Sequence, residues 1–562
     1  MDAVATSHAV DATEIAIIAK ALQSAADEMN LNLIRSAFST VVREAQDCST
    51  ALLDADGNVV AQAETIPMQT AALSLSFKGA AAQLDLSGVT ERHAIIMNDP
   101  YAGGQHLNDI ILFSPIVVDG ALIGWSGSTA HHLDIGGGAA GVNPSATDHI
   151  MEGIVIPPLL MDVERDWHGG MIERLIFANV RTAEIGLGDV NAQFAANHTG
   201  RVRLKELAER YGVAGLRRAM DAVMDYAERR MRAAIAELPD GTYRGEASID
   251  RDVFVDEPVT VRVTLQVTGS DLGVDFTGTD AQVRSMFNCP VASAHAAVFA
   301  AVRSVIADKD MPANDGCNRP LDIHLPKGSL LNPNPPAPVR ARMAAAYRAF
   351  DSVQGALAGA MREKVPAQGF NSTTGFYIGQ RRSDGYRVFV DVLGGGFGAG
   401  HAYEGVDACD NILSNCRITP IEAFEQANPH LRMEATELIP DSGGAGRWRG
   451  GLGFRRRFAV LEEGTFLNLY SDHYRVAPSG AEGGGPGGLG SLVIERGGEA
   501  ISLPPMAAAE LQVGDVVVLS VGGGGGYGDP RERPRELVER DLADGRITVD
   551  HARAHYGYTA TG

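Results

Sequence analysis

The sequence is poor in cysteine and has no long hydrophobic segment. Its five cysteines among 562 residues are an odd number, are widely spread and form no C-x-x-C pair. This usage argues against a disulfide scaffold and against a thiolate zinc site, and it is typical of a cytoplasmic protein. No run of 18 apolar residues occurs, and residues 1–10 lack the cationic and apolar regions of a signal peptide. We therefore predict neither a membrane span nor a cleaved leader.

Basic side chains are too few to balance the acidic ones. Lys and Arg together number 48, whereas Asp and Glu number 70, so the formal net charge is −22 with neutral histidine. An acidic surface repels the phosphates of nucleic acids and the head groups of anionic lipids. We expect neither nucleic-acid nor membrane partners.

Several motifs of nucleotide-binding and hydrolytic enzymes are missing as well. The sequence contains no G-x-x-x-x-G-K-[ST], and no G-x-G-x-x-G that joins a strand to a helix and precedes a suitably spaced acid. It also contains neither G-x-S-x-G nor H-E-x-x-H, the signatures of many serine hydrolases and zinc peptidases. The chain is therefore expected neither to bind a nucleotide itself nor to act alone as one of these hydrolases.

Glycine, by contrast, is abundant in a composition that is otherwise ordinary. Hydrophobic residues make up 45% and charged residues 21% of the chain, as in folded soluble proteins. The 65 glycines include runs at 136–138 and 522–526. Because glycine lacks a Cβ atom, such runs predict tight turns and close approaches between backbones.

Apolar periodicity predicts a mixed α/β (α+β) fold. A capping box at residues 11–14 precedes apolar positions at helical spacing, which predicts a long first helix. Further helices are predicted over 171–238, 291–307 and 340–362. An Asp-Gly turn predicts a hairpin over 50–65, and other strands are predicted at 93–98, 110–118, 121–130 and 259–267.

The length and the changes of pattern predict a multidomain chain. The apolar period changes from helical to alternating near residue 240, and glycine-rich, strand-like sequence begins near residue 440. We predict an N-terminal α/β region (1–240), a central α/β region (241–440) and a β-rich C-terminal region with a terminal helix (441–562).

The segment from residue 98 to residue 138 holds the strongest signal for chemistry. It places His106, Asp109, His131, His132 and Asp134 among glycines. Imidazole and carboxylate groups are common ligands of zinc, manganese and iron. Two predicted strands around a turn at residue 119 would return His131 to the side of His106 and Asp109. His131 and His132 would face opposite ways on a strand, so one of them is expected to bind the same ion. The alternative interpretation is that these residues only form hydrogen bonds within loops.

Eight motifs, in order between residues 98 and 530, resemble the hydantoinase B/oxoprolinase family, and the resemblance runs from about residue 12 to about residue 535. They are NDPYAGGQHLNDI (98–110), AHHLDIGG (130–137), EGIVIPP (152–158), NVR with GDVNAQFAA (179–196), DFTGTDAQV (275–283), NDGCNRP (314–320), DSGGAGRWRGG (441–451) and GGGGYGDP (523–530). The resemblance implies an ATP-dependent cyclic amidase that opens a hydantoin, oxoproline or lactam ring. An A-type partner would use ATP to phosphorylate the substrate, and the B-type chain would hold a divalent metal ion and complete the reaction in a hetero-oligomer such as α2β2.

The resemblance also implies specific site residues. By family motif, the metal ligands would be Asp47, His106, Asp109 and His131, with Asp47 in QDCS where many relatives have DFS. His132 and Asp134 are candidates for outer-shell or proton-transfer roles. Two alternatives remain open, namely a component of an ATP-dependent ketone carboxylase of the acetone or acetophenone type and a non-catalytic structural subunit.

Overall fold

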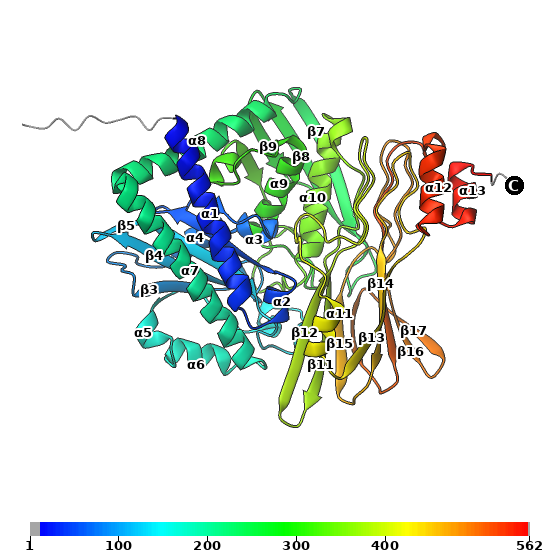
Figure 1. Ribbon diagram of the computed structural model, residues 1–562, viewed down its shortest axis with the longest axis horizontal. Coiled ribbons are helices and arrows are strands. Elements are labelled where there is room, and N and C mark those ends of the chain that lie inside the picture. The colour runs from blue at the N-terminus through cyan, green and yellow to red at the C-terminus, as the bar shows by residue number, and fades with distance from the viewer. Residues whose placement is uncertain (1–11, 560–562) are drawn as a thin grey trace, which may run out of the picture.

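The computed structural model describes residues 12–559. Residues 1–11 lie outside the described residues. They include Asp11 of the predicted capping box and the segment 1–10, for which we predict no leader. The predicted mixed α/β fold is confirmed, with strands arranged in four sheets (Figure 1). Within residues 12–559, no helix combines the length and the apolar character needed to cross a membrane. The division of the chain at 240 and 440 stays a prediction.

The N-terminal part contains a six-stranded antiparallel sheet with the order β2-β1-β5-β4-β3-β6. Its strands are β1 (Cys48–Asp54), β2 (Val59–Gln62), β3 (His93–Met97), β4 (Asp109–Val118), β5 (Ala121–His131) and β6 (Leu159–Asp162). Helices α1 (Ala12–Ser36) and α7 (Ala183–Tyr211) pack together over one face (Figure 1). On the other face, Phe77 of α4 (Leu73–Ala81) contacts Phe113 and Trp125. The predicted long first helix, the hairpin and the three following strands are thereby confirmed.

Shorter elements of this part connect the sheet to the rest of the molecule. They are α2 (Thr40–Arg43), α3 (Pro67–Thr70), η1 (Pro100–Ala102), η2 (His149–Glu152), α5 (Val163–Asp166) and α6 (Met171–Phe177). Helix α3 lies against α9 (Val291–Ile306) of the next sheet region, and α2 contacts β12 (Gly385–Leu393) of the C-terminal part. These contacts join segments that are far apart in the sequence.

A four-stranded sheet follows, with the order β10-β9-β8-β7. Its strands are β7 (Gly241–Ile249), β8 (Val259–Thr268), β9 (Asp271–Asp275) and β10 (Leu321–His324), and its helices are α8 (Val213–Ile235), α9 (Val291–Ile306) and α10 (Met343–Ala358). Two short 3₁₀ turns, η3 (Asp315–Asn318) and η4 (Arg362–Lys364), belong to the same region. A single buried apolar cluster extends from α1 through this sheet to α10, so the two sheet regions share a core.

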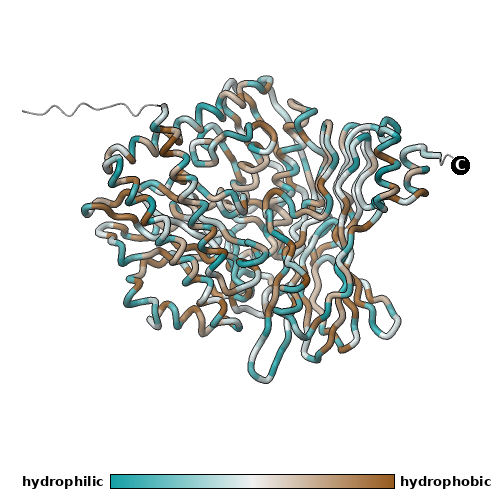
Figure 2. Tube along the Cα trace, in the orientation of Figure 1, coloured by the Kyte–Doolittle hydropathy of each residue, from teal (hydrophilic) through white to brown (hydrophobic). Residues whose placement is uncertain are grey.

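The C-terminal part is rich in strands, as predicted, and it begins with β11 at residue 374. One sheet has the order β12-β11-β15-β18, with β11 (Thr374–Arg382), β12 (Gly385–Leu393), β15 (Thr465–Tyr470) and β18 (Met506–Glu510). The other has the order β13-β14-β19-β16-β17, with β13 (Leu431–Leu438), β14 (Phe454–Val460), β16 (Ser491–Arg496), β17 (Glu499–Leu503) and β19 (Val516–Val521). Side chains of both sheets form one apolar core. Figure 2 shows hydrophobic residues along these strands and a hydrophilic turn between β11 and β12.

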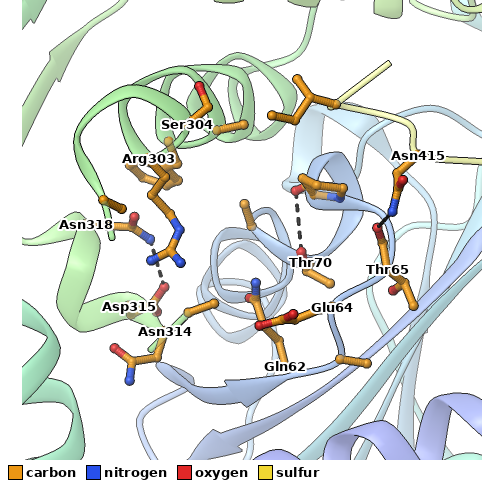
Figure 3. A pocket seen from close by; sticks show the side chains of 18 of the residues that line it. Gln62, Glu64, Thr65, Thr70, Arg303, Ser304, Asn314, Asp315, Asn318 and Asn415 are labelled. Atoms are coloured by element: carbon orange, nitrogen blue, oxygen red, sulfur yellow. Dashed lines mark hydrogen bonds between the residues drawn. The ribbon is translucent and has the colours of Figure 1, made fainter. Parts of the chain in front are cut away.

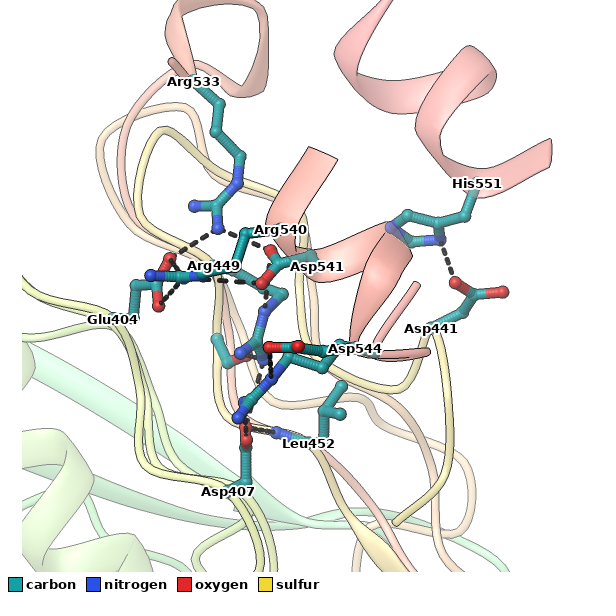
Figure 4. Close-up of polar contacts among 12 residues, drawn as sticks. Glu404, Asp407, Asp441, Arg449, Leu452, Arg533, Arg540, Asp541, Asp544 and His551 are labelled. Carbon is teal, nitrogen blue, oxygen red and sulfur yellow. Dashed lines mark hydrogen bonds and ion pairs between the residues drawn. The ribbon is translucent and has the colours of Figure 1, made fainter. Parts of the chain in front are cut away.

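The last described elements are a 3₁₀ turn, η5 (Pro530–Glu532), and two helices, α12 (Arg535–Ala543) and α13 (Val549–Tyr556). Another short helix, α11 (Ile421–Ala427), lies beside the strands. The sequence predicted a single terminal helix. Buried charges attach α12 to the preceding loops (Figure 4). Arg533 donates to Asp541 over 2.6 Å, and Arg449 lies 3.4 Å from the same carboxylate and 3.1 Å from Asp407.

The glycine-rich segments of the C-terminal part lie directly against one another. Gly524 donates its N–H to the carbonyl of Gly451, and Gly396 donates to Gly522, both over 3.0 Å. A Cβ atom at Gly396 would lie 1.9 Å from the carbonyl oxygen of Gly451. Backbones can approach this closely only where side chains are missing, which explains why glycine is abundant.

We predict that Gly396→Ala destabilises the protein, whereas Gly355→Ala does not. The new methyl group at Gly396 would displace buried backbone, which costs about 1 to 3 kcal/mol. Gly355 is exposed within α10 and has no atom within 4 Å of an added Cβ, so alanine should stabilise the helix by about 0.5 to 1 kcal/mol. Urea unfolding of both variants tests this, and equal effects at the two sites would contradict it.

Candidate metal centre

Three adjacent strands bring Asp47, Asp109 and His131 to the same edge of the six-stranded sheet. Asp47 directly precedes β1, Asp109 begins β4 and His131 ends β5. Because β5 runs antiparallel to both neighbours, its end lies beside their beginnings. Asp109 is the register partner of His131, and the N–H of His131 donates to the carbonyl of Asp47 over 3.0 Å. This confirms the prediction that the hairpin of β4 and β5 returns His131 to the side of Asp109.

His106 reaches this edge from the loop between β3 and β4. Its carbonyl accepts the N–H of Asp109 over 3.1 Å, which closes the turn. The side chain of Asn98 fixes this loop. Its nitrogen donates to the carbonyl of Leu107 and its oxygen accepts the N–H of Ile156, each over 2.7 Å. The spacing of three residues between His106 and Asp109 thus places both side chains at one point.

The four side chains converge in the interior of the protein. Nε2 of His106 lies 3.1 Å from Oδ1 of Asp109, and Nδ1 of His131 lies 3.5 Å from the same oxygen. Oδ2 of Asp47 lies 3.6 Å from Nδ1 of His131. Asp109 is fully buried, and even Asp47, the most accessible of the four, is only 8% exposed. Two nitrogen and two oxygen atoms therefore face a common point.

The other oxygen of each carboxylate is held by a fixed donor. Gln69 of α3 donates to Oδ1 of Asp47, and Arg342 donates to Oδ2 of Asp109, both over 2.7 Å. Arg342 is itself held by Ser293, whose hydroxyl oxygen accepts from Nε over 3.1 Å. These contacts leave one oxygen of each carboxylate directed at the two imidazoles.

A second buried arginine contacts the ring nitrogens of the two histidines that do not face the common point. Nη1 of Arg340 lies 2.7 Å from Nδ1 of His106, and Nη2 lies 3.4 Å from Nε2 of His131. The guanidinium also donates to the hydroxyl of Tyr377. Its backbone is fixed by Glu152, whose carboxylate accepts the N–H groups of Val339 and Arg340 over 3.1 and 2.8 Å.

Burial and charge set the protonation of the cluster. Burial lowers the pKa of His131 to about 4 and the pKa of His106 well below its ordinary value, so both imidazoles are neutral at pH 7. Burial acts to raise the pKa of Asp109, but His106 and Arg342 outweigh it and hold this pKa well below its usual value. Burial and the nearby Asp109 raise the pKa of Asp47 to about 8.

The cluster fits a divalent metal ion. Ligand atoms of His106, Asp109 and His131 all lie within 4.8 Å of one another. Nε2 of His106 and Oδ1 of Asp109 are buried and lie 3.1 Å apart without the alignment of a hydrogen bond, and neither atom has another hydrogen-bond partner in the described part of the chain. Polar atoms are rarely left in this state inside proteins, and a cation would satisfy them. Neutral imidazoles and carboxylates suit zinc, manganese or iron.

His132 and Asp134 lie elsewhere. His132 points away from its neighbour, as the strand alternation predicted, toward Asp189 and Gln193 of α7. Asp134 accepts the N–H of Arg181 over 2.7 Å and a second contact from its guanidinium over 3.0 Å. Neither residue lines the small cavity at the cluster.

Sequence reasoning did not find the residues that surround the cluster. Arg340, Arg342 and Gln69 were not among the candidates, and Glu152 appeared only within a family motif. The two arginines follow a proline-rich connector and lie in an otherwise apolar stretch, which is an unusual place for charge. Two charged residues in an apolar stretch could have suggested that the arginines are buried and paired. The sequence could not show which residues they contact.

The fold and the cluster define a mixed α/β protein with a candidate metal centre at a sheet edge. Residues 11–530 match the Hydantoinase B/oxoprolinase family. This match covers most of the chain, and the protein belongs to that family.

Individual relatives agree with this assignment. The chain is 33% identical to the B component of a putative D-/L-hydantoinase from Pseudomonas sp. (strain NS671), over 98% of this chain and 96% of that protein. It is 30% identical to the beta component of the caprolactamase from Pseudomonas jessenii, over 99% and 97%. The crystal structure of the ATP-dependent caprolactamase from that species superimposes with a TM-score of 0.90 at 29% identity, covering 98% and 97% of the two chains. The nucleotide-free structure of an acetone carboxylase shares the fold, with a TM-score of 0.87 at 18% identity over 97% and 79%.

We predict that Arg342→Met destabilises the metal-free protein by about 3 to 5 kcal/mol, because it leaves the carboxylate of Asp109 buried without its cation. Adding Asp109→Asn should restore part of the loss, since the remaining side chain is neutral. As a control, Arg381→Met removes an exposed pair with Glu510 and should cost less than about 1 kcal/mol. Chemical unfolding in the presence of a chelator measures all three, and an additive double variant would contradict the coupling.

Proposed function

We propose that the chain is the metal-containing B-type component of an ATP-dependent cyclic amidase. It would act on a hydantoin, oxoproline or lactam that an A-type ATPase partner has phosphorylated. The observation that carries the proposal is the buried group of two histidines and two aspartates in a chain of this family. Its relatives are named as the B component of a hydantoinase and the beta component of a caprolactamase, which supports a division of the enzyme into different subunits.

Asp47, His106, Asp109 and His131 would hold the ion, which would be zinc, manganese or iron. When bound, such an ion supplies Lewis acidity and lowers the pKa of coordinated water. Arg342 and Gln69 orient the two carboxylates, because each donates to the oxygen that faces away from the common point. The main-chain carbonyl of Arg340, 3.2 Å from Nδ1 of His106, would orient that imidazole, because a neutral ring that binds an ion through Nε2 carries its proton on Nδ1. Fixed outer contacts of this kind typically change metal affinity 10- to 100-fold when they are removed.

The contacts of His132 and Asp134 favour positioning over proton transfer. The N–H of His132 donates to the carbonyl of Asn108, and the side chain of Asn108 donates back to the carbonyl of His132, each over 2.8 Å. This pair holds the end of β5 against the beginning of β4. Asp134 fixes the following glycine turn, since it accepts the N–H groups of Gly136 and Gly141.

The chemistry explains why a partner and ATP are needed. Resonance between nitrogen and carbonyl makes an unstrained cyclic amide a poor electrophile, and its neutral nitrogen is a poor leaving group. Phosphorylation of the amide oxygen overcomes the first obstacle, because the carbon of the phosphorylated lactim is electrophilic. After water adds to that carbon, the ring nitrogen can take up a proton and leave as the amine, and hydrolysis of the resulting acyl phosphate releases phosphate and the ring-opened acid. This chain has no phosphate-binding loop of the Walker type, so the phosphorylation is assigned to the partner. A phosphorylated intermediate would be lost to bulk water, which favours an enclosed hetero-oligomer such as α2β2.

We predict that His106→Ala and Asp109→Asn each remove bound metal and ATP-dependent ring opening together. The control is His198→Ala, which changes an exposed histidine on α7. Elemental analysis of the purified chain and turnover of the complex with its partner measure the two properties. A variant that loses the metal but keeps full turnover would overturn the proposed role of the cluster, and a wild-type chain without stoichiometric metal would favour a structural subunit.

A second prediction separates ring opening from ketone carboxylation. The reconstituted complex should hydrolyse ATP in the presence of a cyclic amide and release the ring-opened acid without added bicarbonate. Testing hydantoins, 5-oxoproline and lactams against ketones, each with and without bicarbonate, measures this preference. ATP turnover that requires both a ketone and bicarbonate would replace the amidase by the carboxylase alternative.

A further inference from the structure

A large pocket lies on the far side of α3 from the histidine and aspartate cluster. It has a volume of about 580 Å³ and opens between the β2–α3 segment on one side and the end of α9 with η3 on the other (Figure 3). Pockets that bind small molecules typically fall between about 300 and 1,000 Å³. The cavity at the cluster, by contrast, has a volume of about 30 Å³.

One turn of helix separates the two cavities. Pro67, Thr70 and Ala71 line the large pocket, whereas Met68 and Gln69 line the cavity at the cluster. Gln69 is the residue that donates to Asp47. The large pocket therefore lies next to the place of the proposed chemistry without being part of it.

Arg303 gives this pocket a positive charge that the protein does not neutralise by direct contact. Its guanidinium donates to the carbonyls of Met311 and Pro312, each over 3.2 Å, and lies 3.2 Å from the sulfur of Cys317. These partners are neutral, and among residues 12–559 no carboxylate lies within ion-pair distance of Arg303. A guanidinium in a pocket with such partners keeps its full charge for an anionic ligand.

Three further charged residues line the pocket: Asp308, which is paired with Arg230, Asp315, whose carboxylate accepts the N–H of Val59, and Lys309. The rest of the wall offers polar and apolar groups. Asn314 is 5% exposed, and its side-chain nitrogen has no hydrogen-bond partner in the described chain. Glu64 projects from the opposite wall to Arg303, with the open space between them (Figure 3). Phe299, Ala300 and Ile412 supply apolar surface. A cation and an anion on facing walls above an apolar surface suit a short molecule with a carboxylate at one end and an amino or ureido group at the other.

We propose that this pocket binds small linear carboxylates that carry a second polar group, with the carboxylate on Arg303 and the second group beside Glu64. Their identity as products of ring opening rests on the function proposed above, because hydrolysis of a cyclic amide creates a new carboxylate and a free amino or ureido group in one chain. The pocket would then be the place where the product is held next to the metal centre.

The test is calorimetric titration of the purified full-length chain with 6-aminohexanoate and N-carbamoylglycine. The corresponding primary amides, which lack the negative charge, serve as control ligands. Both carboxylates should bind, and the amides should bind at least tenfold more weakly. Arg303→Gln should lower the affinity for both carboxylates tenfold or more. Arg319→Gln is the matched control, because Arg319 is paired with Asp225 and Glu228 and does not line the pocket.

A second variant protects the test against a folding defect in Arg303→Gln. Glu64 is exposed, so Glu64→Gln should fold normally and should weaken 6-aminohexanoate, which carries an ammonium group, more than N-carbamoylglycine. Equal binding of acids and amides, or unchanged affinity in Arg303→Gln, would overturn the proposal. If the carboxylates bind as expected but the complex opens no ring, the proposed function fails and the pocket stands. If rings open but no carboxylate binds, only the pocket fails.

Discussion

The pairing of Asp109 with Arg342 is the interaction on which the centre depends. A carboxylate taken fully out of water must be compensated by charge or hydrogen bonds, and Arg342 does this from a segment 233 residues further along the chain. The same contact attaches the edge of the first sheet to the connector before α10. Because α10 packs on the second sheet, this one ion pair links the centre to the packing of two sheet regions. The pair is buried, and the apolar core is continuous across both regions.

Much of the cluster could be predicted because its geometry is local. His106 and Asp109 are three residues apart, and the Asp119-Gly120 turn joins two strands whose lengths return His131 to the level of Asp109. Strand alternation then separates His131 from His132. These three features depend on the spacing of residues along one hairpin. Asp47 was reached only by resemblance, because its strand pairs with β5 through residues as distant in the sequence as Cys48 and Ala130.

The outer contacts could not be predicted, because they depend on tertiary packing. Gln69, Arg340 and Arg342 reach the cluster from two distant segments, and no local pattern states where those segments meet. The contacts between the glycine-rich segments could not be predicted for the same reason. Their abundance predicted close backbone approach, but the pairing of Gly396 with Gly522 and of Gly451 with Gly524 appears only once the C-terminal loops are stacked. The high glycine content indicated that backbones approach each other closely, but only the fold shows which glycines are paired.

The balance of charge around the cluster connects its structure to the proposed chemistry. Two carboxylates, Asp47 and Asp109, face two guanidinium groups, Arg340 and Arg342, and the imidazoles are neutral. Without a cation the raised pKa of Asp47 shows that a second negative charge is poorly tolerated there. A divalent ion would reverse this preference, because its own charge is the largest in the site. The nearby Asp410 also acts on Asp47, so three ionised carboxylates face two guanidinium groups and the protein has one excess negative charge at the site. A divalent ion would leave the site positive. A buried positive site would favour an anion, such as the phosphorylated amide of the proposed reaction, over a neutral ring.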